Sequence, residues 1–184
     1  MHMITRLFLA SSRLDLAALR QVLHRIAFAW CHDAAMADDL VQDTLTRVWS
    51  RRAQLREATA VKAWAVSIMH HCWIDMLRAR RDGDDIADWE DTLESPCDTP
   101  DVQCDRERLI ACVRAAVARL PLAQRQVITL VDLEAFSYAE VAHILEVPVG
   151  TVMSRLSRAR AALRTMIERS LRARTEPTYL RSVK

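Results

Sequence analysis

The sequence contains few residues that break helices and has no long apolar run. Two glycines and five prolines occur in 184 residues. Together with abundant alanine, leucine and arginine, this scarcity argues for a mostly helical protein. No run approaches the roughly 18–20 apolar residues that cross a bilayer. The N-terminal LFLA is also too short for the core of a signal peptide. We therefore expect an all-α chain without direct membrane insertion.

Closely spaced cysteine pairs are also missing. The five cysteines are an odd number and are scattered, which suits the reducing cytoplasm better than a disulfide framework. Cys97, Cys104 and Cys112 flank an acidic segment, and the three residues HHC occupy 70–72. Neither group has the C-x-x-C spacing typical of a zinc site. We expect no metal and no cofactor, with metal or redox sensing left as the alternative.

The net charge of +2 conceals three segments of opposite sign. Residues 44–81 contain eight Arg and Lys against two acidic residues. Residues 82–107 contain eleven Asp and Glu against one Arg, and residues 151–174 contain seven Arg against Glu168. This order indicates two modules that face polyanions, joined by an acidic tether.

Apolar residues recur at steps of three and four in the first half, which predicts three amphipathic helices. They cover about 13–31, 35–52 and 60–81, and Asp33 can cap the second. Trp64 belongs to the expected core side of the third. Three such helices in 70 residues predict a compact bundle.

The second half begins after residues 82–100, which lose the helical period and collect Asp, Ser, Thr and Pro. Pro100 suits the first turn of a helix over about 101–119. Leu120 and Pro121 end it, and a further helix is predicted over about 122–134. We expect a separate module of four helices.

The last two helices have the pattern of a helix-turn-helix. SYAE at 137–140 is a capping box, in which Ser137 and Glu140 satisfy each other's backbone amides. A short helix over 138–145 follows, then the turn EVPVG and an arginine-rich helix. The arginines could simply solvate an amphipathic helix, but the capping box and turn favour reading of the major groove.

These segments together resemble extracytoplasmic-function (ECF) sigma factors of the sigma-70 family. The stretch LPLAQRQVITLVDLEAFSYAEVAHILEVPVGTVMSRLSRARAALR is similar to region 4, which binds the promoter −35 element. DDLVQDTLTRVWSRRAQL and KAWAVSIMHHCWIDMLRARR are similar to region 2. The resemblance covers about 140 of the 184 residues. It implies region 2 over 1–81, a linker over 82–100, region 4 over 101–174 and a tail over 175–184.

The resemblance also implies partners and site residues. Core RNA polymerase is expected to bind through its β′ clamp helices and β flap, and an anti-sigma factor is a further expected partner. The polymerase-binding residues in region 2 would be Asp39, Leu40, Gln42, Asp43, Leu45, Arg47 and Trp49. The −10 element would meet Lys62, His70, His71, Trp73, Asp75 and Arg78. The −35 element would meet Thr151, Met153, Ser154, Arg155, Ser157, Arg158 and Arg160.

Three residues depart from the family pattern. His71 stands where an asparagine commonly holds a flipped −10 base. Met153 replaces a basic residue, which predicts a salt dependence of −35 binding weaker by about one charge. Glu146 stands where the turn usually has glycine, so a left-handed backbone there would cost about 1 kcal/mol.

We therefore expect an alternative sigma factor that directs promoter-specific initiation and is not itself an enzyme. Nucleophilic catalysis by Cys72 beside a histidine lacks an orienting third group. Two other classes stay open at this point: a sigma-mimicking interaction protein, and a stand-alone helix-turn-helix regulator. The sequence identifies neither the promoter nor the inducing signal nor a small-molecule substrate.

Overall fold

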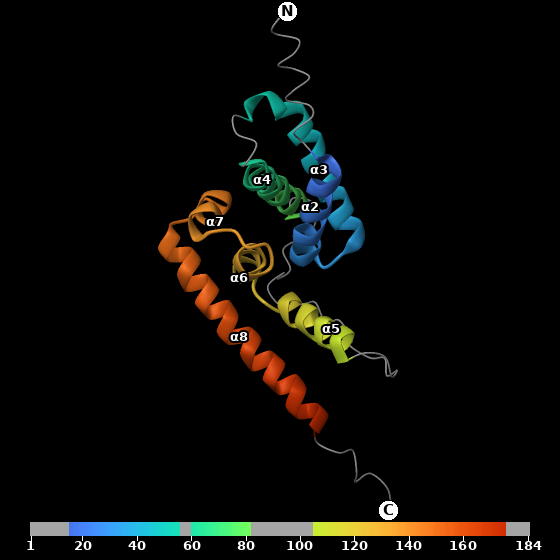
Figure 1. The fold of residues 1–184 in the computed structure, drawn as a ribbon, viewed down its shortest axis with the longest axis vertical. Helices are drawn as coiled ribbons and strands as arrows, with labels where there is room; N and C mark the ends of the chain where they lie inside the picture. Colours follow the sequence, from blue (N-terminus) through green and yellow to red (C-terminus); the bar gives the residue numbers. More distant parts are fainter. Residues whose placement is uncertain (1–14, 56–59, 82–104, 176–184) are drawn as a thin grey trace, which may run out of the picture.

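The computed structural model describes residues 15–55, 60–81 and 105–175, and every regular element in these ranges is helical (Figure 1). The first half contains α2 (Leu16–Cys31), α3 (Ala34–Arg51), the short 3-10 turn η1 (Arg52–Gln54) and α4 (Val61–Arg81). The second half contains α5 (Asp105–Ala118), α6 (Leu122–Ile128), the π-helical turn η3 (Thr129–Leu133), α7 (Tyr138–Leu145) and α8 (Val149–Thr175). The all-α prediction is confirmed. The predicted linker and the residues beyond 175 lie outside the described ranges.

Carboxylates begin the first two helices. Asp15 Oδ1 accepts hydrogen bonds from the amides of Ala17 and Ala18, at 3.1 and 3.0 Å. Asp33 Oδ1 accepts from the amide of Met36 at 2.7 Å, which confirms its predicted capping role. Each carboxylate satisfies helix-end amides that have no partner within the helix.

The bundle of α2, α3 and α4 buries the apolar stripes that the periodicity predicts. Trp64 is half-buried and packs against this core, as predicted. The fully or almost fully buried side chains include Leu23, Ile26, Trp30, Leu40, Val41, Val48, Val66 and Met69. The burial of these side chains supplies the main driving force for the bundle.

The helix predicted over 122–134 divides into two parts. Its α-helical hydrogen bonding ends at Ile128, and a wider π-helical turn follows. The amide of Glu134 donates to the Thr129 carbonyl at 3.1 Å, and the amide of Phe136 donates to the Leu130 carbonyl at 3.0 Å. A π turn adds a residue and so changes which side chains face inward. As a result, Glu134 is buried at the end of the turn.

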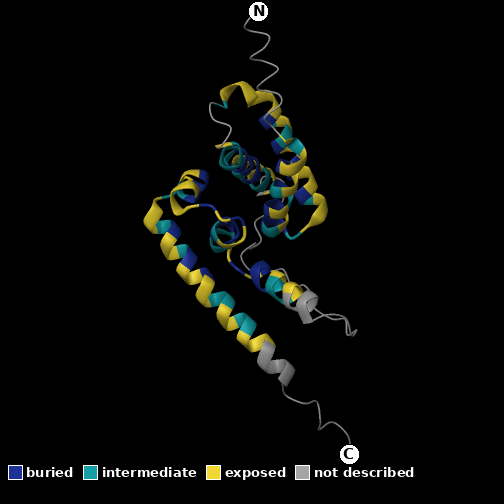
Figure 2. Ribbon diagram, viewed as in Figure 1, coloured by how far each residue is buried: buried dark blue, intermediate teal, exposed yellow. Residues whose placement is uncertain are grey.

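The two halves pack against each other, which the sequence did not predict. α2 contacts α5 and α6, and α4 contacts α7 (Figure 1). Buried residues line these facing surfaces, while the outer face of α8 is exposed (Figure 2). The Arg125 guanidinium links the halves by donating to the carbonyls of Trp30, Ala118 and Leu120, at 2.8, 2.7 and 2.9 Å. None of the described helices combines the length and apolarity that a membrane span needs.

The end of α2 has a half-buried histidine that predicts acid sensitivity. His32 has a left-handed backbone (φ 55°) and caps the helix, and its Nε2 atom is buried with no hydrogen-bond partner among the described residues. Burial, followed by the charge of Arg125, lowers the pKa of His32 to about 4. The folded state therefore keeps the ring neutral, while the unfolded chain takes up a proton near pH 6.5. Stability is lost as the pH falls from 6.5 towards 4.

We expect His32→Asn to reduce this loss, because asparagine tolerates a left-handed backbone and does not titrate. Urea unfolding at pH 7 and pH 5 measures it. The loss of stability between these pH values should be smaller in the variant by about 1–2 kcal/mol, a figure reduced because the ring keeps some contact with water. Equal losses in the two proteins would contradict the assignment.

Candidate nucleic-acid and partner interfaces

The predicted helix-turn-helix is formed by α7, the turn at 146–148 and α8. The capping box is present: Ser137 Oγ accepts from the Glu140 amide, and the Glu140 carboxylate accepts from the Ser137 amide at 2.8 Å. The Ser137 hydroxyl also donates to the Glu140 carboxylate at 2.7 Å, and this hydrogen bond, followed by that from the Ser137 amide, lowers the pKa of Glu140. The shared core of the two helices consists of Val141, Ile144, Leu145, Val152 and Leu156, all buried.

The turn between α7 and α8 has a strained backbone. Glu146 adopts a left-handed conformation, with φ 55° and ψ 43°. This confirms that the position requires the geometry that glycine adopts most easily, and a residue with a Cβ pays about 1 kcal/mol for it. The amide of Val147 donates to the Ala142 carbonyl at 3.0 Å and closes the turn. α8 therefore leaves α7 at an angle fixed by backbone hydrogen bonds.

The outer face of α8 carries most of the residues predicted to contact the −35 element. Met153 is 53% exposed, and Ser154, Ser157 and Arg158 are exposed beside it. Thr151 and Arg155 are half-buried at the edge of this face. These residues lie on the N-terminal part of a long helix, where a recognition helix contacts base edges.

Arg160 differs from the other arginines of α8. It forms a two-pronged ion pair with Asp132 of η3, with Nη2–Oδ1 and Nε–Oδ2 distances of 2.6 and 3.0 Å. These hydrogen bonds and the charge of Asp132 raise the pKa of Arg160. Its guanidinium is therefore held against η3 and can reach a ligand only by leaving Asp132.

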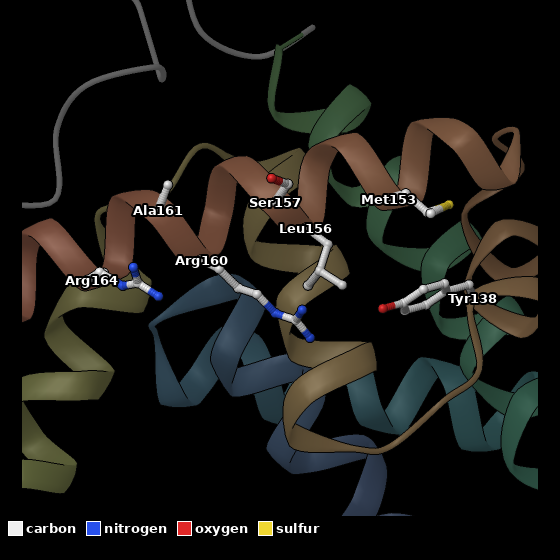
Figure 3. A pocket seen from close by; sticks show the side chains of 7 residues that line it. All are labelled: Tyr138, Met153, Leu156, Ser157, Arg160, Ala161 and Arg164. Atoms are coloured by element: carbon white, nitrogen blue, oxygen red, sulfur yellow. The ribbon is translucent and has the colours of Figure 1, made fainter.

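A shallow hollow of about 330 Å³ lies along this side of α8 (Figure 3). Arg160 and Tyr138 extend towards each other at its lower edge. Its lining consists of Tyr138, Met153, Leu156, Ser157, Arg160, Ala161 and Arg164. The hollow is open to solvent, and no carboxylate or imidazole lines it to activate the Ser157 or Tyr138 hydroxyl, so it suits contact with an extended partner better than catalysis.

The exposed face of α3 is a polar ridge. Asp39, Gln42, Asp43 and Trp49 are exposed, and Trp49 lies 4.4 Å from the guanidinium of Arg52. Thr46 belongs to the same ridge and was missed, although its spacing of three residues from Asp43 signals it.

The other residues predicted to bind polymerase lie elsewhere on α3. Leu40 has no exposed surface and packs in the core, so it supports the ridge from behind. Leu45 is half-buried, and Arg47 forms an ion pair with Asp75 of α4 at 3.1 Å. This pair joins a predicted polymerase-binding residue to a predicted −10 residue and braces α3 against α4.

The residues predicted to read the −10 element do not share one open surface. Trp73 is 4% exposed and its ring packs in the core, so in this conformation it cannot stack on a base. His70 is half-buried, and burial lowers its pKa, helped by the neighbouring His71. His71 and Arg78 are exposed. The buried ring of Trp73 is therefore not available for the stacking role predicted for it.

Two of the predicted −10 residues contact the second half of the chain. Lys62 Nζ donates to the Glu134 carbonyl at 2.8 Å and lies 4.6 Å from the Phe136 ring. His71 Nε2 lies 3.1 Å from a carboxylate oxygen of Glu146. The N-terminal part of α4 is thus occupied by η3 and by the end of α7.

Glu134 is the central charge of this contact. Its side chain is 5% exposed and accepts from Arg25 Nε and Nη2 at 2.8 and 3.0 Å, with Lys62 Nζ at 3.4 Å. The Glu134 hydrogen bond raises the pKa of Arg25. Two cations on different helices therefore neutralise a carboxylate that would otherwise be buried at a large cost.

The thiols have inert surroundings. Cys31 and Cys72 are buried, and burial raises the pKa of Cys31 to about 12 and also raises that of Cys72. A thiolate is the reactive form, so neither residue is a nucleophile here. Cys112 is half-buried, and Cys97 and Cys104 lie outside the described residues. Within the described ranges, no three His, Cys, Asp or Glu residues are grouped as a metal site.

Comparison with known families matches both halves of the chain. Residues 16–82 match Sigma-70 region 2, and residues 110–163 match Sigma-70, region 4. The ECF RNA polymerase sigma factor EcfG of Rhodopseudomonas palustris is 32% identical over 160 residues, which cover 85% of each chain. The ECF RNA polymerase sigma factor SigM of Mycobacterium tuberculosis is 34% identical over 145 residues, which cover 79% of this chain and 71% of SigM.

Two solved structures have similar folds. The sigma factor RpoE of Bartonella quintana, crystallised in complex with the anti-sigma factor NepR, aligns with a TM-score of 0.64 and 27% identity, covering 84% of this chain and 94% of RpoE. CnrH, in complex with the cytosolic domain of CnrY, aligns with a TM-score of 0.57 and 23% identity, covering 88% of this chain and 96% of CnrH. The second likeness concerns the fold alone.

The contact at Glu134 predicts a measurable loss of stability. We expect Glu134→Gln to lower the free energy of unfolding by about 1–3 kcal/mol, because two cations lose a buried anion but keep partial access to water. Urea unfolding measures this loss. Asp38→Asn is the control, since Asp38 pairs with Arg20 and His24 at 3.7 and 3.5 Å on the exposed surface. That change should cost no more than about 0.5 kcal/mol, and equal costs would contradict a special role for Glu134.

Proposed function

This chain belongs to the ECF sigma factors of the sigma-70 family, and from its structure we infer how its two halves divide the work of promoter recognition. As an alternative sigma factor, it binds core RNA polymerase and promoter DNA and directs transcription initiation. The observation that carries this function is the tandem match of regions 2 and 4, in order, on one helical chain.

We assign the exposed face of α8 to the −35 element. Arg158 is exposed one turn beyond Ser154, and no described residue forms an ion pair with it. An arginine in this place can bind the two acceptors of a guanine in the major groove, while Ser154, Ser157 and Thr151 suit phosphate or base contacts. Asp132 holds Arg160 back from this role and orients it along the hollow.

The two arginines should therefore differ in effect. We expect Arg158→Ala to weaken binding of a matched −35 element by about 1–3 kcal/mol and to reduce discrimination against a mismatched one. Arg160→Ala should change discrimination less, because its guanidinium is already paired. Binding of the holoenzyme to matched and mismatched promoter fragments measures both. Arg169→Ala, in an exposed position further along α8, is the control. Full discrimination by the Arg158 variant would refute the assignment.

We assign the exposed ridge of α3 to core polymerase. Asp39, Gln42, Asp43 and Thr46 lie at steps of three and four on one face, with Trp49 at its end. Carboxylates in such a row can pair with basic residues of a partner helix, and an exposed aromatic ring can anchor the contact. The buried Leu40 and the paired Arg47 hold this face in position.

Charge reversal on the ridge should weaken polymerase binding. We expect Asp43→Lys to reduce affinity for core polymerase by about tenfold, and Asp39→Lys with Asp43→Lys to reduce it further, through like-charge repulsion. Competition with the labelled unmodified chain for core polymerase measures this. Glu168→Lys makes the same change of charge at an exposed position of α8 and should compete normally. Normal competition by the double variant would remove the docking role.

We assign the exposed part of α4 to the −10 element. His71 offers an imidazole that can stack on an unpaired base and hydrogen-bond with it, and Arg78 supplies a charge for the single strand. Lys62, His70 and Asp75 lie on the same helix, and the buried Trp73 fixes that helix in the core.

In this function the polymerase supplies the catalysis, and the chain itself is not an enzyme. The chain works in the cytoplasm, where core polymerase and promoter DNA are found.

The sigma-factor assignment is favoured over the two other classes. The hypothesis of a stand-alone helix-turn-helix regulator does not explain the match to region 2 over residues 16–82. In addition, the relatives reported above are themselves named as sigma factors. The complex of Bartonella RpoE with NepR further supports an anti-sigma factor as a partner of this chain.

Run-off transcription with purified core polymerase and fragmented genomic DNA tests the function directly. Discrete transcripts that share two upstream elements are expected, and they would also identify the promoter. Binding to core polymerase without any transcript would favour a sigma mimic. DNA binding without polymerase binding would favour a stand-alone regulator.

A further inference from the structure

The helix-turn-helix exposes apolar side chains at the start of α8, although DNA-binding surfaces are usually polar. Seven large hydrophobic side chains are exposed in the described part of the chain, and three of them belong to this motif: Tyr138, Val149 and Met153. Val149 and Met153 are 44% and 53% exposed and lie four positions apart, so they are neighbours on one face of α8. Tyr138 and Met153 lie at the same end of the hollow (Figure 3). Single exposed apolar residues are ordinary, but a group of three marks a contact surface.

The polar side chains around Met153 leave few free hydrogen-bond donors. Ser154 Oγ donates to the Thr151 carbonyl at 3.0 Å, so its hydrogen is used within the helix. The guanidinium of Arg160 is held by Asp132. A thioether is not a donor, so Met153 does not replace these groups. At this end of the helix, base recognition through hydrogen bonds is therefore limited.

The helix surface beside Met153 is open to close approach. Gly150 lies three positions earlier, in the first turn of α8. A Cβ at Gly150 would meet no described atom within 4 Å beyond the adjoining helix backbone, and the backbone there is not left-handed. Neither packing nor backbone conformation therefore requires glycine, which weakens a helix relative to alanine. What glycine provides is a bare Cα, which lets a ligand come close to the helix.

One group in the major groove matches an exposed apolar side chain. Thymine carries a C5-methyl group there, whereas adenine, guanine and cytosine are distinguished by hydrogen-bonding groups. Contact between this methyl group and the side chain of Met153 removes apolar surface of both from water. A lysine or arginine in the same place would suit a phosphate instead, and a phosphate contact carries no direct sequence information.

We propose that Met153 is a specificity-determining residue, whose side chain contacts the C5-methyl group of one thymine in the −35 element. This proposal rests on the assignment of α8 to that element and adds a base to it. Met153 lies on the N-terminal part of α8, where a recognition helix meets base edges, which favours DNA over a protein as the partner of this apolar group. Arg158 then selects guanine at one position of the element, and Met153 selects thymine at another.

Removal of single methyl groups from the DNA tests the contact. Each thymine of the −35 element, on both strands, is replaced in turn by deoxyuridine, which pairs identically but lacks the methyl group. The promoter fragment comes from the run-off transcripts, and competition binding of the holoenzyme is measured. We expect one replacement to weaken binding of the unmodified protein about two- to fourfold, the size expected for one methyl group removed from water. Deoxyuridine placed between the two promoter elements is the control and should have no effect.

Three variants assign the effect to the side chain. Met153→Ala should bind the methylated and the methyl-free fragments equally. Met153→Leu, which keeps an apolar side chain of similar volume, should retain the difference. Met153→Lys should lose the difference and steepen the salt dependence of binding by about one charge. All three positions of substitution are on the surface, so the core of the motif is kept.

Several results would overturn the proposal. These are a −35 element in which no thymine is sensitive to loss of its methyl group, and equal sensitivity in Met153→Ala and the unmodified protein. Weaker binding of Met153→Ala to core polymerase with unchanged methyl sensitivity would also overturn it, because the apolar group would then face a protein. The sigma-factor role fails separately, if the unmodified holoenzyme does not initiate. Discrete transcripts from a promoter that is insensitive to methyl loss would refute only the contact of Met153.

Discussion

A buried carboxylate at the centre of the molecule determines how its two halves sit together. Glu134 is almost inaccessible to water and needs cations, which it finds in Arg25 of α2 and Lys62 of α4. An unpaired charge in this place would be costly, so the two helices of region 2 and the end of η3 must meet there. The Arg125 guanidinium, which binds the Trp30 carbonyl, makes the neighbouring contact. The relative position of the halves therefore follows from the need to satisfy a few buried polar groups.

Local backbone irregularities make these contacts possible. The π turn at Thr129–Leu133 brings Glu134 to the buried side, where a continued α-helix would direct it elsewhere. Within the described ranges, three residues other than glycine have left-handed backbones, His32, Ala135 and Glu146, and each lies at a helix end or turn beside the junction of the halves. The surrounding packing holds these three residues in their strained left-handed conformations, which an isolated helix would not retain.

The surfaces of the molecule are consequently unequal. α3 and α8 present polar faces to solvent, while α4 is shared between the core of region 2 and the contact with α7. α4 is thus both part of the core of region 2 and the helix that we assign to the −10 element. This double use explains why Trp73, which has the chemistry of a stacking residue, is buried in the structure, and why His71 is exposed yet engaged.

The sequence by itself determined the helices, their order and the family, because these depend on short-range patterns. Periodicity, the Asp33 cap and the Ser137–Glu140 capping box each involve residues within a few positions of one another, so they predict the helices and the helix-turn-helix directly. The same periodicity places Leu40 on the apolar face of its helix with Val41 and Val48, and all three are buried.

Only the tertiary structure decided the pairing of Arg160 with Asp132, the burial of Glu134 and the contact of His71 with Glu146. These partners are 28 to 109 positions apart. Helical periodicity shows which stripe of a helix is apolar, but it does not show which distant helix a polar side chain will meet.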